Sequence, residues 1–249
     1  MNIFNDFTKS KKRFTRLNCH PKNKTSKKAS SCLDDDTIVL LKRIWNKRHP
    51  DKKIMKRNKA KIWIQLKKYL SDSCSHEMCW IDKTIDSIDV KNKIKNELFV
   101  PTMPDSWNKN PTEWLSSIEI GDVLKQYEDK HDEFLFIGPS PIDYDSIDTK
   151  SFSSEGICVW PELCNFDLSQ YIENGISKIG FIFNTDKHYK SGSHWISLYL
   201  DINKQILFFF DSAGNKPPQQ IVKLMKIIES QCNMNNIMIK SDANYPKTH

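Results

Sequence analysis

Two apolar runs separated by a short polar turn are the feature that most constrains how this chain can fold. They lie in residues 191–218, which read SGSHWISLYLDINKQILFFFDSAGNKPP. Each run has the length of a strand and is rich in β-branched and aromatic residues, and few residues separate them. The sequence therefore predicts an antiparallel hairpin that turns at Ile202 and Asn203.

The same hairpin brings a histidine and an aspartate together. If it turns at residues 202–203, Asp201 lies opposite Lys204, and His194 lies directly opposite Asp211 with both side chains on one face. A carboxylate there would accept the imidazole N–H, fix the tautomer and leave the other ring nitrogen free as a base. A slip of one residue would place the two side chains on opposite faces. The alternative is a structural pair, or two unrelated polar residues at the rim of the sheet.

The rest of the chain predicts helices first and strands later. One helix fits TIVLLKRIW at residues 37–45, with acids ahead of it and His49-Pro50-Asp51 ending it. Others fit residues 59–70 and 219–231, and a further helix begins at the N-cap Thr112. That helix has an apolar face formed by Leu115, Ile118, Val123 and Tyr127. Short runs between residues 133 and 242 that are bounded by Gly, Pro, Asn and Asp predict the strands, the last of them at 236–240.

Composition divides the chain into three parts. Residues 1–30 carry nine Lys and Arg against one acid, while the other 219 residues sum to a net charge of −1. Such a block of charge predicts a disordered tail over 1–30, which either aids solubility or binds a polyanion. Prolines 101, 104 and 111 mark a boundary between a helical domain over 31–100 and a mixed domain over 101–249.

The cysteines indicate reduced thiols. There are seven, an odd number without regular spacing, and the chain has neither a secretion signal nor an apolar run that could span a membrane. Cys74, His76 and Cys79 could form part of a zinc site, but no fourth ligand is evident. We therefore expect no metal and no cofactor.

Several segments resemble one superfamily of thiol proteases. The segments GSHW at 192–195 and FFFDSAGNKPP at 208–218 resemble the His-Trp and Asp-Ser signatures of the cysteine proteases that process ubiquitin-like modifiers, a superfamily that includes adenovirus protease. The resemblance is strongest to the branch found in large DNA viruses, to which EFLFIGPSPIDYD, CVWPELCNF and IWNKRHPD are also similar. It covers most of residues 31–249.

The resemblance implies an α+β fold in which a small helical domain precedes a papain-like protease core with a mainly antiparallel sheet. It implies a cysteine endopeptidase with His194 as general base and acid, Asp211 orienting it, and Trp195 as the wall of a narrow channel for glycine-containing substrates. Trp195 as ordinary core is the alternative. Viral members cut structural precursor proteins, so we expect such substrates, and a location in the virion and in the host cytoplasm during assembly.

The nucleophile departs from the family pattern. In that pattern a Gln-bearing turn and the cysteine follow the acid by a helix and a strand, whereas the printed sequence reaches NYPKTH without them. We expect the core to be truncated, with the nucleophile beyond residue 249, and these 249 residues alone to be inactive. Cys232 ends a helix, where the helix dipole disfavours a thiolate. The alternative functions are a non-catalytic virion protein and a nucleic-acid-associated protein on the same fold.

Overall fold

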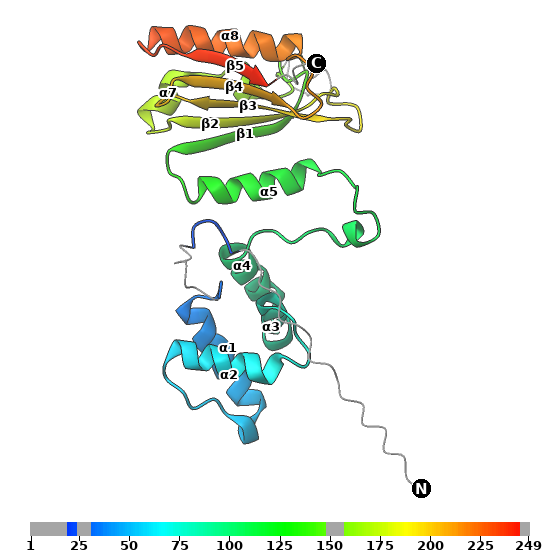
Figure 1. Cartoon of the computed structure of the whole chain (residues 1–249), viewed down its shortest axis with the longest axis vertical. Helices are drawn as coiled ribbons and strands as arrows, with labels where there is room; N and C mark the ends of the chain where they lie inside the picture. The colour runs from blue at the N-terminus through cyan, green and yellow to red at the C-terminus, as the bar shows by residue number, and fades with distance from the viewer. Residues whose placement is uncertain (1–18, 24–30, 148–156, 245–249) are drawn as a thin grey trace. The chain divides into compact units, whose positions relative to one another are not determined.

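The chain forms two compact units. The structure, a computed structural model, describes residues 19–23, 31–147 and 157–244 (Figure 1). The units are residues 1–111 and 112–249, so the division falls after Pro111, later than the boundary expected after residue 100. Each unit has its own cluster of buried apolar side chains and is described by itself.

The first unit is helical, as the sequence predicts. Its helices are α1 (Asp35–Arg48), α2 (Lys59–Leu70), α3 (Glu77–Thr84) and α4 (Ile88–Leu98), with short 3-10 turns at Pro50–Lys52 and Asp105–Asn108 (Figure 1). A side chain just before each α-helix accepts a hydrogen bond from a backbone N–H of the first turn, which would otherwise lack a partner. The capping residues are Asp34, Asn58, His76 and Ser87.

Part of the predicted tail is ordered. Cys19 forms a disulfide with Cys32, and the buried His20 donates its backbone N–H to the carbonyl oxygen of Leu98 at 3.0 Å. The expectation of a disordered tail over 1–30 is therefore wrong for residues 19–23, because the disulfide joins them to Cys32, ahead of α1, and a backbone hydrogen bond joins them to the end of α4. The rest of that segment, 1–18 and 24–30, lies outside the described residues.

The expectation of reduced thiols is also wrong for this structure. Three disulfides form, Cys19–Cys32, Cys74–Cys79 and Cys158–Cys164, and only Cys232 is free. Each pair is close in sequence, and its Cα atoms lie within 6.4 Å of each other, a normal disulfide separation.

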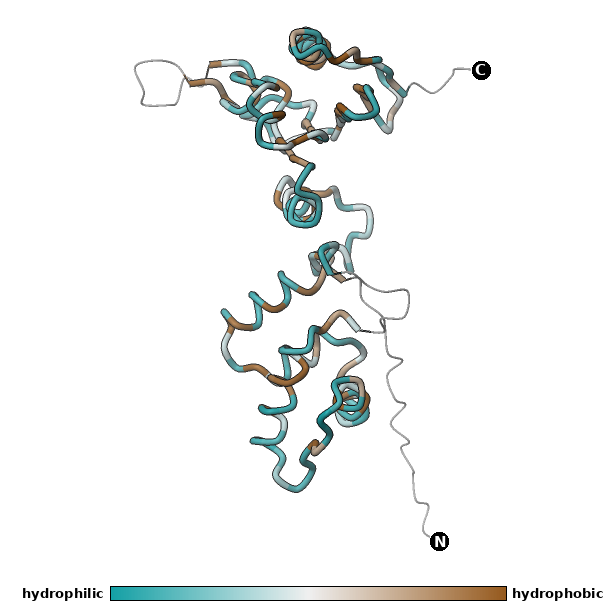
Figure 2. The backbone as a smooth tube through the Cα atoms, turned by 90° about the vertical axis from the view of Figure 1, so that its left-hand side faces the viewer, coloured by the Kyte–Doolittle hydropathy of each residue, from teal (hydrophilic) through white to brown (hydrophobic). Residues whose placement is uncertain are grey.

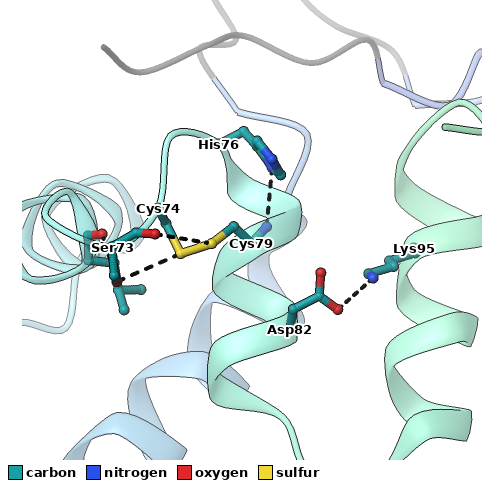
Figure 3. Close-up of a disulfide and its surroundings, with 7 residues drawn as sticks. Ser73, Cys74, His76, Cys79, Asp82 and Lys95 are labelled. Carbon is teal, nitrogen blue, oxygen red and sulfur yellow. Dashed lines mark hydrogen bonds and ion pairs between the residues drawn. A yellow bond between two sulfur atoms is a disulfide. The ribbon is translucent and has the colours of Figure 1, made fainter. Parts of the chain in front are cut away.

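The zinc alternative fails for the same reason. Figure 3 shows Cys74 and Cys79 bonded to each other, while Nδ1 of His76 accepts the N–H of Cys79 at 3.2 Å as the cap of α3. All three candidate ligands are therefore used otherwise. Over the described ranges no group of His, Cys, Asp and Glu could hold a metal ion.

The second unit is a five-stranded sheet with helices. Its helices are α5 (Ser117–Glu128), α6 (Pro161–Cys164), α7 (Leu168–Glu173) and α8 (Gln219–Met234). The strands are β1 (Phe134–Pro141), β2 (Lys178–Asn184), β3 (Trp195–Asp201), β4 (Ile206–Asp211) and β5 (Lys240–Asn244), and they lie in that order across the sheet (Figure 1). The last strand begins later than the predicted 236–240.

This is the predicted α+β fold with a mixed sheet. β3 pairs antiparallel with both neighbours, but β1 pairs parallel with β2, and β4 pairs parallel with β5. The outer pairs are parallel because a helical crossover joins their strands, α6 and α7 in the first case and α8 in the second. The expectation of a mainly antiparallel sheet thus holds only for the central pairs.

Alternating burial builds the core of this unit. Every second residue of β2 is buried, and α8 buries the 3–4 spaced Ile221, Leu224 and Ile228 in the same cluster. Figure 2 shows this mixture of apolar and polar residues along the strands and helices. Among the helices that the structure describes, none has both the length and the apolarity to cross a membrane.

The first helix of this unit differs from its prediction. It begins at Ser117 after a capping box between Ser116 and Glu119, and not after Thr112. The four residues of its predicted apolar face are largely exposed, and Ile120 is the apolar side chain that it buries. The periodicity identified the helix but not the face that packs.

Alkylation of the cysteines tests the disulfide pattern. Because six thiols are paired and Cys232 is fully buried, we expect the folded chain to take up no maleimide. The denatured chain should take up one maleimide without reductant and seven with it, counted by mass spectrometry. Seven labels without reductant would restore the expectation of reduced thiols.

Candidate active site

The backbone before β3 holds His194 at the edge of the sheet. The carbonyl oxygen of His194 accepts the N–H of Thr185 at 2.9 Å, which ties it to the end of β2. Asn184 accepts the N–H of Ser193 at 3.2 Å. A side chain at Gly192 would lie 2.7 Å from the amide of Asn184, and φ there is +95°, so only glycine fits.

Asp211 ends β4 and is held by its own turn. One carboxylate oxygen accepts the N–H of Ala213 at 2.8 Å, and the other accepts the N–H of Asn215 at 3.2 Å. The first oxygen also lies 2.5 Å from Nε2 of His194. The Asp211 side chain is 3% exposed and the His194 side chain 27%, so a buried acid holds an imidazole that solvent reaches.

The predicted contact is present, but the predicted register is wrong. Asp211 pairs with Ile196, and Asp201 pairs with Ile206 rather than Lys204. The turn holds four residues, 202–205, and Gln205 has a positive φ of 58°. The shift is an even number of residues, so it preserves the face, and His194 reaches Asp211 diagonally from just outside β3.

The surroundings of Asp211 favour its charged form. Burial raises the pKa of this carboxyl, but hydrogen bonds from His194, Ala213 and Asn215 oppose it. Together they outweigh burial and hold the pKa below its usual value. Asp211 therefore stays a carboxylate at neutral pH, able to accept the Nε2 proton and leave Nδ1 of His194 to a second partner.

An open cleft of about 590 Å³ adjoins His194, and tryptophans line part of it. Trp195 is the first residue of β3, and its indole N–H donates to the carbonyl oxygen of Leu115 at 2.9 Å. The ring of Trp114 meets the ring of His194 edge-on, with centroids 6.3 Å apart. Trp195 thus lies in the cleft wall, where it is fixed by a hydrogen bond.

Sequence reasoning missed a second imidazole–carboxylate pair, whose histidine, His188, lines this cleft. Asp143 is buried. One of its carboxylate oxygens accepts the backbone N–H of His188 at 2.9 Å, and the other lies 2.9 Å from Nδ1 of the same residue. The cleft also contains the hydroxyl of Ser140, which is buried and has no hydrogen-bond partner. No local pattern signals this pair, because the parallel pairing of β1 with β2 brings its members together.

None of the seven cysteines is an activated thiol. Six are in disulfides. Cys232 is fully buried in the core, and burial, with a smaller contribution from Glu229, raises its pKa to about 11. A protonated, inaccessible thiol is not a nucleophile at neutral pH.

Replacing Asp211 with asparagine tests the electrostatics of the pair. We expect Asp211→Asn to lower the free energy of unfolding at pH 7 by about 1.5–3 kcal/mol, because hydrogen bonds to a charged group are lost. The native pKa is depressed, so this contribution is present above the unfolded pKa and disappears as pH falls through the native value. Urea denaturation at pH 7 and pH 3 measures the difference. Asp122→Asn, at an exposed site on α5, is the control, and an equal loss in both variants would contradict the prediction.

No protein-family model matches the chain. A protein of Acanthamoeba polyphaga mimivirus whose name describes a thiol protease is 26% identical over 219 residues, which cover 82% of this chain and 68% of the relative. The SUMO-1 cysteine protease of African swine fever virus is 25% identical over 130 residues, 49% of this chain and 46% of the relative. The latter match thus spans about half of either protein.

A solved structure shares the fold. The crystal structure of the African swine fever virus protease superposes with a TM-score of 0.58 and 18% identity, covering 94% of this chain and 79% of that one. The fold class expected from the resemblance is therefore confirmed. By these matches, the chain is similar to viral cysteine-type peptidases, one of which is named a SUMO-1 cysteine protease.

Proposed function

We propose that this chain carries the histidine–acid half of a cysteine endopeptidase site, with His194 as general base and acid and Asp211 orienting it. The observation that carries the proposal is the 2.5 Å contact between His194 Nε2 and buried Asp211, at the edge of a tryptophan-lined cleft. A thiol placed at Nδ1 would lose its proton to the imidazole and form a thiolate–imidazolium pair. Protonated His194 would then return that proton to the leaving amine.

The cleft supports a peptide substrate in extended form. Trp195 is held in place by its hydrogen bond to Leu115, and Trp114 lies edge-on to His194, so two indoles stand where a substrate backbone would pass. Walls of this kind favour residues without side chains, which supports glycine before the scissile bond. Viral structural precursors are the substrates we propose, with action in the virion and in the host cytoplasm during assembly.

The thiol that completes the site is none of the cysteines at residues 1–249. This follows from their pairing and from the buried, protonated state of Cys232. The second candidate function, a relative that binds glycine-rich chains without cutting them, rests on the same observation. Binding and cleavage must therefore be measured separately.

Peptide binding tests the proposed cleft. We expect the purified chain to bind an extended peptide with a central Gly-Gly, and Trp195→Ala to weaken binding at least about tenfold, because an aromatic wall is removed. Isothermal titration calorimetry measures both. The matched control is Trp107→Ala in the first unit, which should bind like the parent chain. Unchanged binding by Trp195→Ala would exclude this cleft as the peptide site.

Cleavage of the same peptide separates the two candidates. Because no cysteine here is activated, we expect no turnover by residues 1–249 and no effect of Cys232→Ser on peptide binding. Chromatography of the incubated peptide measures turnover. Turnover that disappears in Cys232→Ser would identify Cys232 as the nucleophile and contradict its assignment to the core.

A further inference from the structure

The two units carry net charges of opposite sign, which the net charge of the whole chain does not reveal. Residues 31–111 carry 17 Lys and Arg against 11 Asp and Glu, whereas residues 112–249 carry 12 against 19. The near-neutral sum over residues 31–249 is therefore an average of a basic helical unit and an acidic sheet unit. The basic excess does not end with the N-terminal tail.

Most of the excess lies on one connection and the helix after it. Between Asp51 and Asp72 there are eight basic residues and no acid. These are Lys52, Lys53, Lys56, Arg57, Lys59, Lys61, Lys67 and Lys68. A run of this kind predicts a strong local positive potential.

The connection between α1 and α2 is fixed along α1 by its backbone. The carbonyl oxygen of Lys52 accepts the indole N–H of Trp45 at 2.9 Å. Ile54 is fully buried and exchanges two hydrogen bonds with the side chain of Asn46, and Lys42 donates to the carbonyl oxygen of Lys56 at 2.7 Å. These contacts use main-chain atoms, so the basic side chains are left to face solvent from a rigid support.

Neighbouring helices extend this surface. Arg43 and Lys47 are exposed and lie one turn apart on α1. Each directly follows a residue whose side chain binds the connection, Lys42 and Asn46 respectively. On α2, Lys61 and Lys68 are exposed and two turns apart on one face. We call this set the basic surface: Arg43, Lys47, Lys52, Lys53, Lys56, Arg57, Lys61 and Lys68.

Few acids oppose it. Among the contacts that the structure describes for residues 52–61, the one ion pair joins Lys59 to Asp35 at 3.7 Å. Asp35 is at the start of α1, about 18 Å along the axis from Lys47 at a rise of 1.5 Å per residue. Of the ion pairs that the structure describes in this unit, none involves Lys53, Lys56 or Arg57.

We propose that the basic surface binds the phosphate backbone of nucleic acid without reading its sequence. Seven of the eight cations between Asp51 and Asp72 are lysines, which act as point charges for phosphate and are depleted from protein–protein interfaces. Residues 52–57 span at most about 17 Å, roughly five base-pair steps of duplex rise. The proposal is independent of peptidase activity.

Salt-dependent binding of duplex DNA tests this surface. The probe is a fluorescein-labelled 30-base-pair duplex, titrated with the full chain at several salt concentrations and followed by anisotropy. We expect Lys53→Ala, Lys56→Ala and Arg57→Ala together to weaken binding at 100 mM salt at least about tenfold. They should also flatten the plot of log affinity against log salt by about 2.7, since each lost phosphate contact removes about 0.9.

A matched variant controls for net charge alone. Lys130, Lys226 and Lys240 are exposed lysines of the second unit, and replacing all three with alanine removes the same charge. We expect this control to give nearly the same slope of log affinity against log salt as the parent chain. If control and surface variants weaken equally, or if the surface variant keeps the parent slope, the proposal is overturned.

Two further measurements distinguish DNA binding at the proposed site from binding by the N-terminal tail and from binding to a membrane surface. Deleting residues 1–18 removes tail charge but spares Cys19, and the shortened chain should still bind duplex and still lose about tenfold through the surface substitutions. Loss of all binding on that deletion would assign the DNA contacts to the tail and overturn the proposal. So would tighter binding to phosphatidylserine vesicles than to duplex, if the surface substitutions abolish it.

Discussion

The pairing of β3 with β4 decides where the candidate active site lies. Leu198 and Leu200 are buried on the same face as Leu207 and Phe209 of the neighbouring strand, while the residues between them are more exposed. A slip of one residue would exchange these faces and is therefore strongly disfavoured. The burial of the core thus fixes which side of the sheet carries His194 and Asp211, and their contact follows from the hairpin.

Because the buried core fixes the faces of the hairpin, the sequence could predict which side chains of the site share a face. The alternation of apolar residues predicted that His194 and Asp211 share a face, and the structure confirms it. It could not predict the turn, because both a two-residue and a four-residue connection preserve the alternation. In the structure the turn is the longer one, with Gln205 at positive φ, and the contact is diagonal. The catalytic roles themselves stay predictions.

Contacts between distant segments account for the features that sequence reasoning missed. His188 and Asp143 are 45 residues apart, and they meet because β1 and β2 pair in parallel across a crossover. The order in residues 19–23 likewise depends on α4, which lies far along the chain.

The basic surface was missed by sequence reasoning for another reason. Summing residues 31–249 combined two units of opposite sign, so a neutral total concealed the basic surface on α1 and α2.

The arrangement at Asp211 bears on how binding and cleavage relate in this fold. The backbone of its own turn positions the carboxylate, through Ala213 and Asn215, and the hairpin positions His194. Neither constraint involves a cysteine, and Trp195 of the cleft is held by a hydrogen bond within the same unit. The imidazole and the cleft wall are therefore preorganised before a thiol is present. On the proposed function, recognition of a peptide and attack on it are separable, with the cleft serving the first and His194 supplying the base for the second.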